Sequence, residues 1–254
     1  MIQSLNDSIA LEFAPMVGLV VGVAAAASLG IGAYAALAPR SQLFGPTFIG
    51  KRPGTRQLAL TFDDGPNDPH TLRLLEVLAR HGVRATFFLI GRFVAQQPEI
   101  ARAIVAAGHE VANHTYSHPS LLFLSPARVR QELADCEQAL SDAVGAHAPL
   151  FRPPFGARRP HVLHTAWDLK LEPVMWSVTC YDWKPGITPE RIEQHALRQV
   201  RGGDVILLHD GSHRALGADR SATVTATDRL ITRYKAEGYE FVTVSQMMGA
   251  PARD

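Results

Sequence analysis

Cysteine is scarce in this sequence, and charge of either sign shows no strong excess. The 254 residues include only two cysteines, Cys136 and Cys180, whose spacing matches no metal-binding pair. Two separately packed thiols are favoured over a single disulfide. The formal net charge is +1 with both signs interspersed, which excludes a broad basic surface for a nucleic-acid partner. We find no internal repeat, which argues against a repeat protein.

Charged residues are missing from residues 16–38, which read MVGLVVGVAAAASLGIGAYAALA. A helix of this length crosses the roughly 30 Å hydrocarbon core of a bilayer. A helix in a soluble core rarely stays apolar on every face for so long. We therefore predict a transmembrane anchor at 16–38, after a leader at 1–15.

A cleaved signal peptide is the closest alternative to this anchor. Ala33-Tyr34-Ala35 would serve as its cleavage site. The leader, however, carries Asp7 and Glu12 but no Lys or Arg, and the apolar stretch exceeds a usual signal core. An uncleaved anchor is favoured, and the small residues Gly18 and Gly22 give it a weak potential for self-association.

Strands and helices alternate about seven times after a linker at residues 39–56 that is rich in Pro and Gly. Strands are expected at residues 57–62, 85–90, 110–113, 150–152, 173–178, 205–208 and 241–244. Helices are expected at residues 70–80, 98–107, 126–144, 159–169, 189–200 and 222–237. Short strands that are apolar on both sides favour a parallel sheet covered by helices. Seven repeats suit a barrel better than a flat sheet, so we predict an α/β barrel in one domain at 57–254.

Polar side chains collect where the predicted strands end. They are Asp63, Asp64, His114, His118, Arg152, Asp182 and His209. In a parallel barrel the carboxyl ends of the strands lie on one face, and active sites form there. The convergence of five polar loops predicts a functional site at this face.

His114 and His118 are four residues apart, so one helical turn would place both imidazoles on one face. Such a pair suits Zn²⁺, and one carboxylate added to it leaves an open position for water. For the pair alone, two unconnected loop histidines would be the favoured interpretation. The nearby Asp63-Asp64 pair shifts the balance toward a metal site.

Asp63 and Asp64 are adjacent at a strand end, where successive side chains point in different directions. One carboxylate can then bind the metal while the other accepts a proton from an activated water. An Asp-Asp-Gly-Pro turn is the purely structural alternative. His209 can protonate a leaving nitrogen if Asp182 keeps it charged, and Arg152 can pair with Asp63.

Five short motifs along the chain, taken in order, resemble those of the polysaccharide deacetylase (NodB-homology) family of carbohydrate esterases. They are Thr61-Phe62-Asp63-Asp64-Gly65, Asn113-His114-Thr115-Tyr116-Ser117-His118, Arg152-Pro153-Pro154-Phe155-Gly156, Tyr181-Asp182-Trp183 and Leu207-Leu208-His209-Asp210. The resemblance covers about residues 56–245. It implies a distorted (β/α)7-type barrel as the catalytic domain, an acetylated glycan as substrate, and Zn²⁺ or another divalent ion such as Co²⁺.

The resemblance also implies roles for individual residues. It makes Asp64, His114 and His118 the metal ligands, Asp63 the general base oriented by Arg152, and His209 the general acid tuned by Asp182. The backbone N–H of Phe155 would help to hold the oxyanion, and Trp183 and Leu207 would line the acetyl pocket. The chain departs from the family at Thr179, where members often carry Asp, and has Phe155 where many have Tyr. His213 lies close enough to His209 in sequence to reach the groove.

The sequence thus predicts a membrane-anchored, metal-dependent deacetylase of N-acetylated glycans such as chitooligosaccharides or peptidoglycan. The alternatives are an O-acetyl esterase, a deformylase or amidohydrolase of lipid-linked or other small amides, and a non-catalytic glycan-binding module. The intact polar residues disfavour the last of these. We expect the domain outside the cytoplasm, although Arg40, Lys51, Arg52 and Arg56 after the anchor favour the cytoplasmic side.

Overall fold

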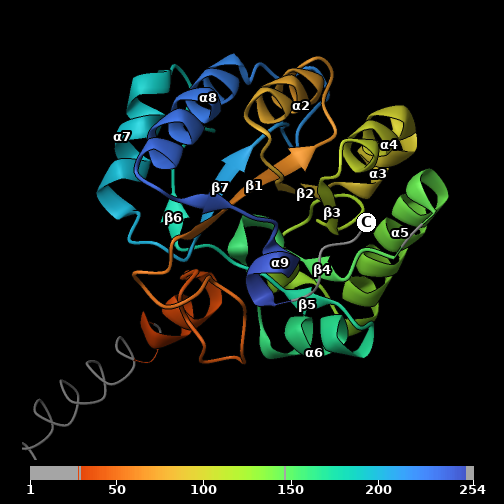
Figure 1. The fold of residues 1–254 in the computed structure, drawn as a ribbon. Coiled ribbons are helices and arrows are strands. Elements are labelled where there is room, and N and C mark those ends of the chain that lie inside the picture. Colours follow the sequence, from red (N-terminus) through yellow and green to blue (C-terminus); the bar gives the residue numbers. More distant parts are fainter. Residues whose placement is uncertain (1–27, 29, 146, 250–254) are drawn as a thin grey trace, which may run out of the picture.

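The computed structural model describes residues 28, 30–145 and 147–249, and its centre is a curled parallel sheet with helices packed outside it (Figure 1). The strand order is β5-β4-β3-β2-β1-β7-β6, and β8 pairs with the start of β1. Every pairing between these strands is parallel. The arrangement is consistent with the distorted (β/α)7 barrel that the sequence predicts.

The elements follow the predicted alternation closely. The strands are β1 (Gln57–Gly65), β2 (Thr86–Leu89), β3 (Glu110–Asn113), β4 (Leu150–Phe151), β5 (Glu172–Pro173), β6 (Val178–Thr179), β7 (Asp204–His209) and β8 (Glu240–Phe241). The helices are α2 (His70–His81), α3 (Gly91–Gln96), α4 (Pro98–Ala106), α5 (Pro126–Val144), α6 (Pro160–Asp168), α7 (Pro189–Gln199), α8 (Ser221–Ala236) and α9 (Val244–Met248). Two single 3-10 turns, η1 (Leu121–Phe123) and η2 (Pro154–Gly156), complete the described part.

Two predicted strands differ from the observed ones. The strand expected at residues 173–178 is interrupted, so β5 pairs with β4, β6 pairs with β7, and Val174 between them pairs with Phe48. The strand expected at 241–244 stops early because Thr243 is the N-cap of α9. Its side chain accepts a bond from the Gln246 N–H while the Gln246 side chain bonds back to the Thr243 N–H.

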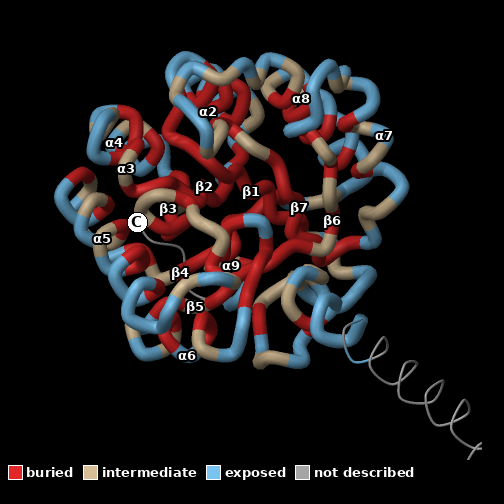
Figure 2. Tube along the Cα trace, turned by 180° about the vertical axis from the view of Figure 1, so that it is seen from behind, coloured by how far each residue is buried: buried red, intermediate tan, exposed pale blue. Residues whose placement is uncertain are grey.

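Alternation along β1 decides which of its side chains enter the barrel. Leu58, Leu60 and Phe62 belong to the large cluster between the sheet and helices such as α2 and α8. Ala59 belongs to the second cluster, which fills the barrel interior. Since strand side chains alternate, Asp63 shares the inner face with Ala59. Figure 2 shows this burial, with the strands buried and the outer helix faces exposed.

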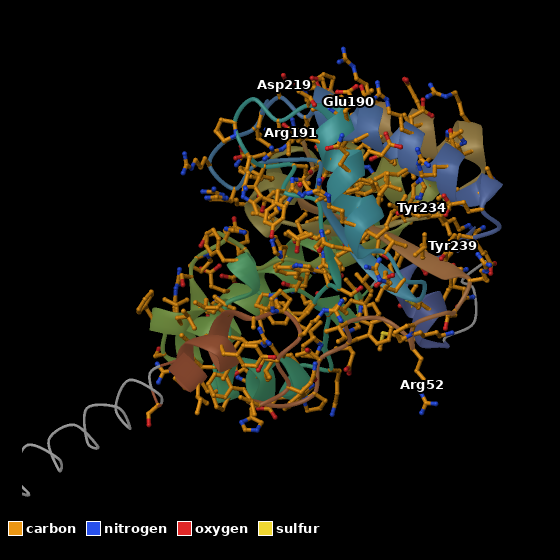
Figure 3. The ribbon with its side chains drawn as sticks, turned by 90° about the vertical axis from the view of Figure 1, so that its left-hand side faces the viewer. Arg52, Glu190, Arg191, Asp219, Tyr234 and Tyr239 are labelled. Atoms are coloured by element: carbon orange, nitrogen blue, oxygen red, sulfur yellow. The ribbon has the colours of Figure 1, made fainter. Side chains whose placement is uncertain are left out.

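Charged side chains lie on the outer helix surfaces. Figure 3 shows Glu190 and Arg191 at the start of α7, and Tyr234 of α8 beside Tyr239. The Tyr234 and Tyr239 ring centroids are 5.5 Å apart, and the two ring planes are nearly perpendicular.

Both cysteines are free and buried, as expected of packed thiols.

The N-terminal stretch packs on the barrel. Residue 28 and residues 30–37 are helical and residue 38 follows the helix, while residues 16–27 and 29 of the predicted anchor lie outside the described residues. Within the described part of the chain, no helix combines the length and apolarity needed to cross a bilayer. The predicted linker at 39–56 contacts the sheet, because Phe48 pairs with Val174 and Gly50 with Asp204.

Gly65 ends β1 against the buried carboxyl of Asp210, and a Cβ at this position would overlap Asp210 Oδ2. We expect Gly65→Ala to lower the free energy of unfolding by about 1–3 kcal/mol, as overpacking does. Urea denaturation of the purified chain measures this change. Gly32→Ala is the control, because its Cβ meets open space. Equal stability of wild type and Gly65→Ala would contradict this packing.

Candidate active site

A cleft of about 530 Å³ opens at the carboxyl ends of the strands. Eight of the ten predicted site residues line it: Asp63, Asp64, His114, His118, Phe155, Trp183, Leu207 and His209. The other two, Arg152 and Asp182, are buried and bind Asp63 and His209 through their side chains. The structure therefore brings all the predicted residues to one place.

The two aspartates at the end of β1 face the same cleft because the strand is irregular there. Asp64 has a left-handed φ of 74°, and the pairing register with β2 shifts between Asp63 and Gly65. A regular strand would send adjacent side chains to opposite faces. Here His114 Nε2 lies 3.7 Å from Asp63 Oδ2 and 3.6 Å from Asp64 Oδ1.

His114 and His118 lie on a loop, so the expected helical turn between them is wrong. Thr115 and His118 both have positive φ, at 65° and 59°. The Thr115 N–H donates to Asn113 Oδ1, and the His118 N–H donates to Thr115 Oγ1. This side-chain bonding folds the loop back, and the two imidazole centroids come within 4.9 Å.

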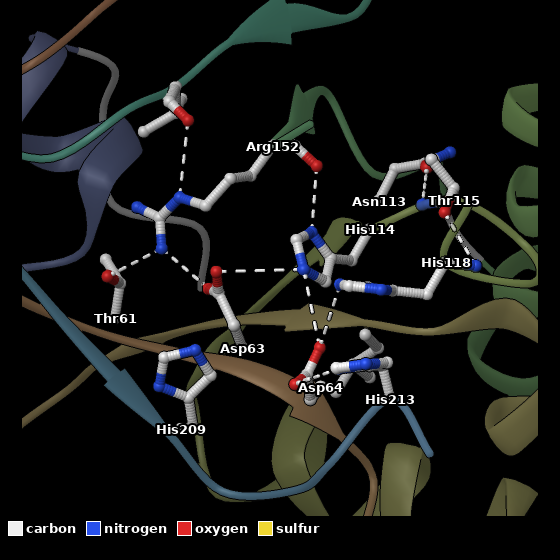
Figure 4. A network of polar contacts seen from close by, with 12 residues as sticks. Thr61, Asp63, Asp64, Asn113, His114, Thr115, His118, Arg152, His209 and His213 are labelled. Atoms are coloured by element: carbon white, nitrogen blue, oxygen red, sulfur yellow. Dashed lines mark hydrogen bonds and ion pairs between the residues drawn. The ribbon is translucent and has the colours of Figure 1, made fainter. Parts of the chain in front are cut away.

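Asp64, His114 and His118 fit a divalent metal ion. Their ligand atoms lie within 4.8 Å of one another, and all three residues are buried (Figure 4). His114 Nδ1 donates to the Arg152 carbonyl at 2.8 Å, which leaves its Nε2 free as a ligand. Asp64 Oδ1 is buried without a hydrogen-bond partner among the described residues. An orphaned carboxylate oxygen beside two imidazoles is the donor set of a catalytic Zn²⁺ site.

The protonation states of these three groups also suit a metal. Burial lowers the pKa of His114 to about 4 and that of His118 to about 3, so both imidazoles are neutral near pH 7. Burial alone would raise the pKa of Asp64, but the side chains of His213 and His118 outweigh it and hold this pKa far below its usual range. Metal ligands must be deprotonated, and these three are.

Asp63 is held by a buried arginine. Arg152 Nη1 donates to Asp63 Oδ1 at 2.6 Å and to Thr61 Oγ1 at 2.9 Å. Its other nitrogens donate to the carbonyls of Val174 and Met175. Burial raises the pKa of the Asp63 carboxyl, although Arg152 pulls it down. The result is a fixed carboxylate with more affinity for a proton than an exposed one.

His209 is paired with Asp182 on the other side of the cleft. His209 Nδ1 donates to Asp182 Oδ1 at 2.8 Å, and the His209 N–H donates to Oδ2 at 2.7 Å. Thr223 also donates to Oδ2, which fixes the carboxylate. Burial alone would lower the pKa of His209, but Asp182 raises it to about 9. His209 is therefore charged at neutral pH and keeps Nε2–H for the cleft.

Phe155, Trp183 and Leu207 form apolar walls of the cleft. Phe155 lies in η2 with a φ of 58°, and its ring packs edge-on against His118 at 4.7 Å. The Trp183 ring lies 5.1 Å from His209, and 41% of Trp183 is exposed. Leu207 is buried in β7 and still reaches the cleft. The cleft thus has apolar side chains beside its charged groups.

Several cleft residues had no role in the sequence-based prediction. Trp176 and Arg214 line the cleft, and their sequence positions carry no signal for it. Arg220 also lines it, from the segment before α8 that the sequence places near the groove edge. His213 does reach the groove, with its ring stacked on His118 at 4.6 Å and Nδ1 3.7 Å from Asp64 Oδ2. Thr179, where the family pattern suggests Asp, accepts a hydrogen bond from Trp176 Nε1 at 2.9 Å.

The chain matches the family model for polysaccharide deacetylase over residues 50–174. It is 42% identical over 202 residues to a chitooligosaccharide deacetylase from Bradyrhizobium sp. (strain ANU 289), covering 76% of this chain and 91% of that one. A solved peptidoglycan N-acetylglucosamine deacetylase is similar at a TM-score of 0.75 and 33% identity, covering 82% and 94%. A family 4 acetyl xylan esterase from Clostridium thermocellum, in complex with a cobalt ion, is similar at a TM-score of 0.69 and 34% identity, covering 77% and 93%.

Replacement of Asp182 should change the titration of His209. Asp182→Asn removes the negative charge that raises the pKa of His209 to about 9, so this pKa should fall. The wild-type imidazole stays charged until the pH rises through about 9, whereas the variant loses its proton at lower pH. NMR titration of the histidine ring signals measures both. Asp168→Asn, an exposed change far from the cleft, is the control, and an unchanged His209 titration in Asp182→Asn would contradict the assignment.

Proposed function

The chain belongs to the polysaccharide deacetylase family, and from this premise we propose that it is a hydrolase that removes N-acetyl groups from a glycan and releases acetate. One observation carries the proposal: a buried carboxylate fixed by Arg152 and an imidazolium fixed by Asp182 share one cleft with an Asp-His-His donor set. This pairing supplies a base and an acid, which amide hydrolysis requires.

Asp64, His114 and His118 would hold Zn²⁺ or another divalent ion such as Co²⁺. When bound, such an ion supplies a Lewis acid that polarises a carbonyl and lowers the pKa of water to about 7. The similarity to an esterase structure in complex with a cobalt ion supports a divalent ion in this chain. The protein contributes neutral imidazoles and an ionised carboxylate, each already in the state needed.

Asp63 is the proposed general base. Its Oδ1 is occupied by Arg152, so Oδ2, 3.7 Å from His114 Nε2, is the oxygen left to accept a proton from the attacking water. Burial raises the pKa of Asp63 toward the range in which a base both stays ionised and accepts a proton readily. Arg152 keeps the carboxylate oriented as the proton arrives.

The backbone N–H of Phe155 is the proposed donor to the developing oxyanion. η2 places this residue at the cleft beside His118. A fixed amide aimed at developing charge stabilises the transition state without reorganisation, and loss of one such donor costs about a hundredfold or more in kcat. Trp183 and Leu207 would enclose the acetyl methyl group.

His209 is the proposed general acid. Its charge at neutral pH, held by Asp182, lets Nε2 give a proton to the departing amine. An amine leaves an amide only when protonated, so the N-deacetylase assignment depends on this group more than ester cleavage would.

The sugar is proposed from the relatives and the shape of the cleft. The half-exposed Trp183 offers a flat apolar face next to His209, which suits a pyranose ring. Chitooligosaccharides and peptidoglycan-like glycans are the proposed substrates, acted on outside the cytoplasm by a domain anchored through the N-terminal apolar stretch. O-acetyl ester hydrolysis is the second candidate, supported by the similarity to an acetyl xylan esterase.

Acetate release by the full-length chain tests the reaction class. The panel contains chitooligosaccharides, peptidoglycan fragments and acetylated xylan, and we expect release from an N-acetylated glycan. Asp63→Asn should reduce kcat by about 10²–10⁴-fold without loss of fold, because the proton acceptor is removed. Asp68→Asn, an exposed neighbour, is the matched control. Turnover at the wild-type rate in Asp63→Asn would contradict the assignment of Asp63 as the general base.

Metal content tests the donor set independently of turnover. His118→Ala should lower the metal affinity at least about tenfold, because one of three ligands is lost, and activity should fall with it. Elemental analysis after dialysis with Zn²⁺ or Co²⁺ measures this, and a chelator should abolish acetate release from the wild type. The exposed His164→Ala serves as control. Equal metal content in wild type and His118→Ala would remove His118 from the site.

A further inference from the structure

Arg158 is a fully buried arginine whose guanidinium binds only backbone carbonyls among the described residues. Only 1% of the residue is exposed. Nη1 donates to Gly156 O at 2.9 Å, and Nη2 donates to Ala38 O at 2.7 Å and Ser41 O at 2.8 Å. A buried charge costs free energy unless it is hydrogen-bonded, so breaking these contacts would destabilise the folded chain.

One end of this network is the loop that carries Phe155. Phe155 and Gly156 both adopt positive φ, at 58° and 66°, and a side chain in this region costs energy unless its surroundings hold it. The Gly156 N–H donates to Pro153 O, and the Ala157 N–H donates to Pro154 O. The Arg158 guanidinium adds the bond to the carbonyl of Gly156, the residue that follows Phe155.

The other end is the carboxyl terminus of the apolar N-terminal helix. The helical residues 30–37 stop beside Ala38, and the free carbonyls there attract a cation, as helix ends do. Besides the two guanidinium bonds, the Arg158 backbone N–H donates to Ala36 O at 3.0 Å. Ala35 is 2% exposed, while Ile31 and Tyr34 of the same helix are exposed. The helix therefore rests on the domain at its last turn.

We propose that Arg158 is a positioning residue that couples the docked end of the N-terminal helix to the Phe155 loop, so that the conformation of the oxyanion-binding amide depends on the helix being in place. The inference rests on the proposed function for the role of the Phe155 amide. The coupling itself rests only on the contacts of Arg158. Arg158 touches no reacting atom and acts through Gly156.

Two full-length variants with matched controls test the coupling. Arg158→Gln removes most of the donors that join the two segments. Arg159→Gln changes the neighbouring, exposed arginine, whose guanidinium donates to Leu122 O instead. Ala35→Asp places a charge in the buried contact of the helix, and Ala33→Asp places the same charge on its exposed face. Each chain is compared with wild type by amide hydrogen exchange and by kcat and KM.

We expect Arg158→Gln and Ala35→Asp to exchange the amides of residues 155–158 at least about tenfold faster than wild type, with the sheet unchanged. The same two variants should lose kcat about tenfold to a hundredfold at nearly constant KM, because the amide is displaced rather than the sugar site. Both controls should match wild type.

Three results would overturn the coupling. These are unchanged loop exchange in Arg158→Gln, faster loop exchange in Arg158→Gln but not in Ala35→Asp, and faster exchange spread over the whole barrel. If the wild type releases no acetate from any glycan, the proposed function fails, and the exchange measurements still decide whether helix and loop are coupled.

Discussion

The buried contact between Arg152 and Asp63 is the interaction on which the rest of the site depends. The guanidinium lies inside the barrel, over the Phe88 ring at 4.0 Å, and joins β1 to the carbonyls of Val174 and Met175. Those carbonyls belong to the interrupted stretch between β5 and β6. There the Arg152 side chain satisfies backbone carbonyls that strand pairing satisfies elsewhere in the sheet. The Arg152 carbonyl also orients His114. One residue thus connects the base, a metal ligand and the barrel wall.

Much of the fold and the position of the site follow from sequence because they depend on local patterns. The spacing of apolar residues predicts the long helix α5 to the residue, and the alternation of short apolar strands predicts the parallel sheet. Since the carboxyl ends of parallel strands lie on one face of the barrel, the polar residues that follow these strands lie close together there. Their order along the chain carried the family resemblance, and with it a role for each of them.

The features of the site that the sequence does not predict depend on backbone conformations without a sequence signature. The left-handed Asp64 turns both carboxylates into one cleft, and the left-handed Thr115 and His118 replace the expected helical turn. The interruption at Val174 follows from contacts with Phe48 and Arg152, which are distant in the sequence. Residues 36–41 dock on Arg158, which is more than a hundred positions away in the sequence. Local composition therefore predicts only the end of an anchor and the start of a linker for this stretch.

The hydrogen bond between Trp176 and Thr179 lies in a stretch of chain that serves the cleft in two ways. Trp176 lines the cleft from the interrupted stretch, where Gly156 packs against its ring. The proposed metal ligands come from β1 and the loop after β3, so none of them shares this stretch. The stretch also holds Arg152, but it does so through the backbone carbonyls of Val174 and Met175, whereas the cleft wall is made by the Trp176 side chain. One short segment thus shapes the cleft with its side chains and supports the proposed base with its backbone.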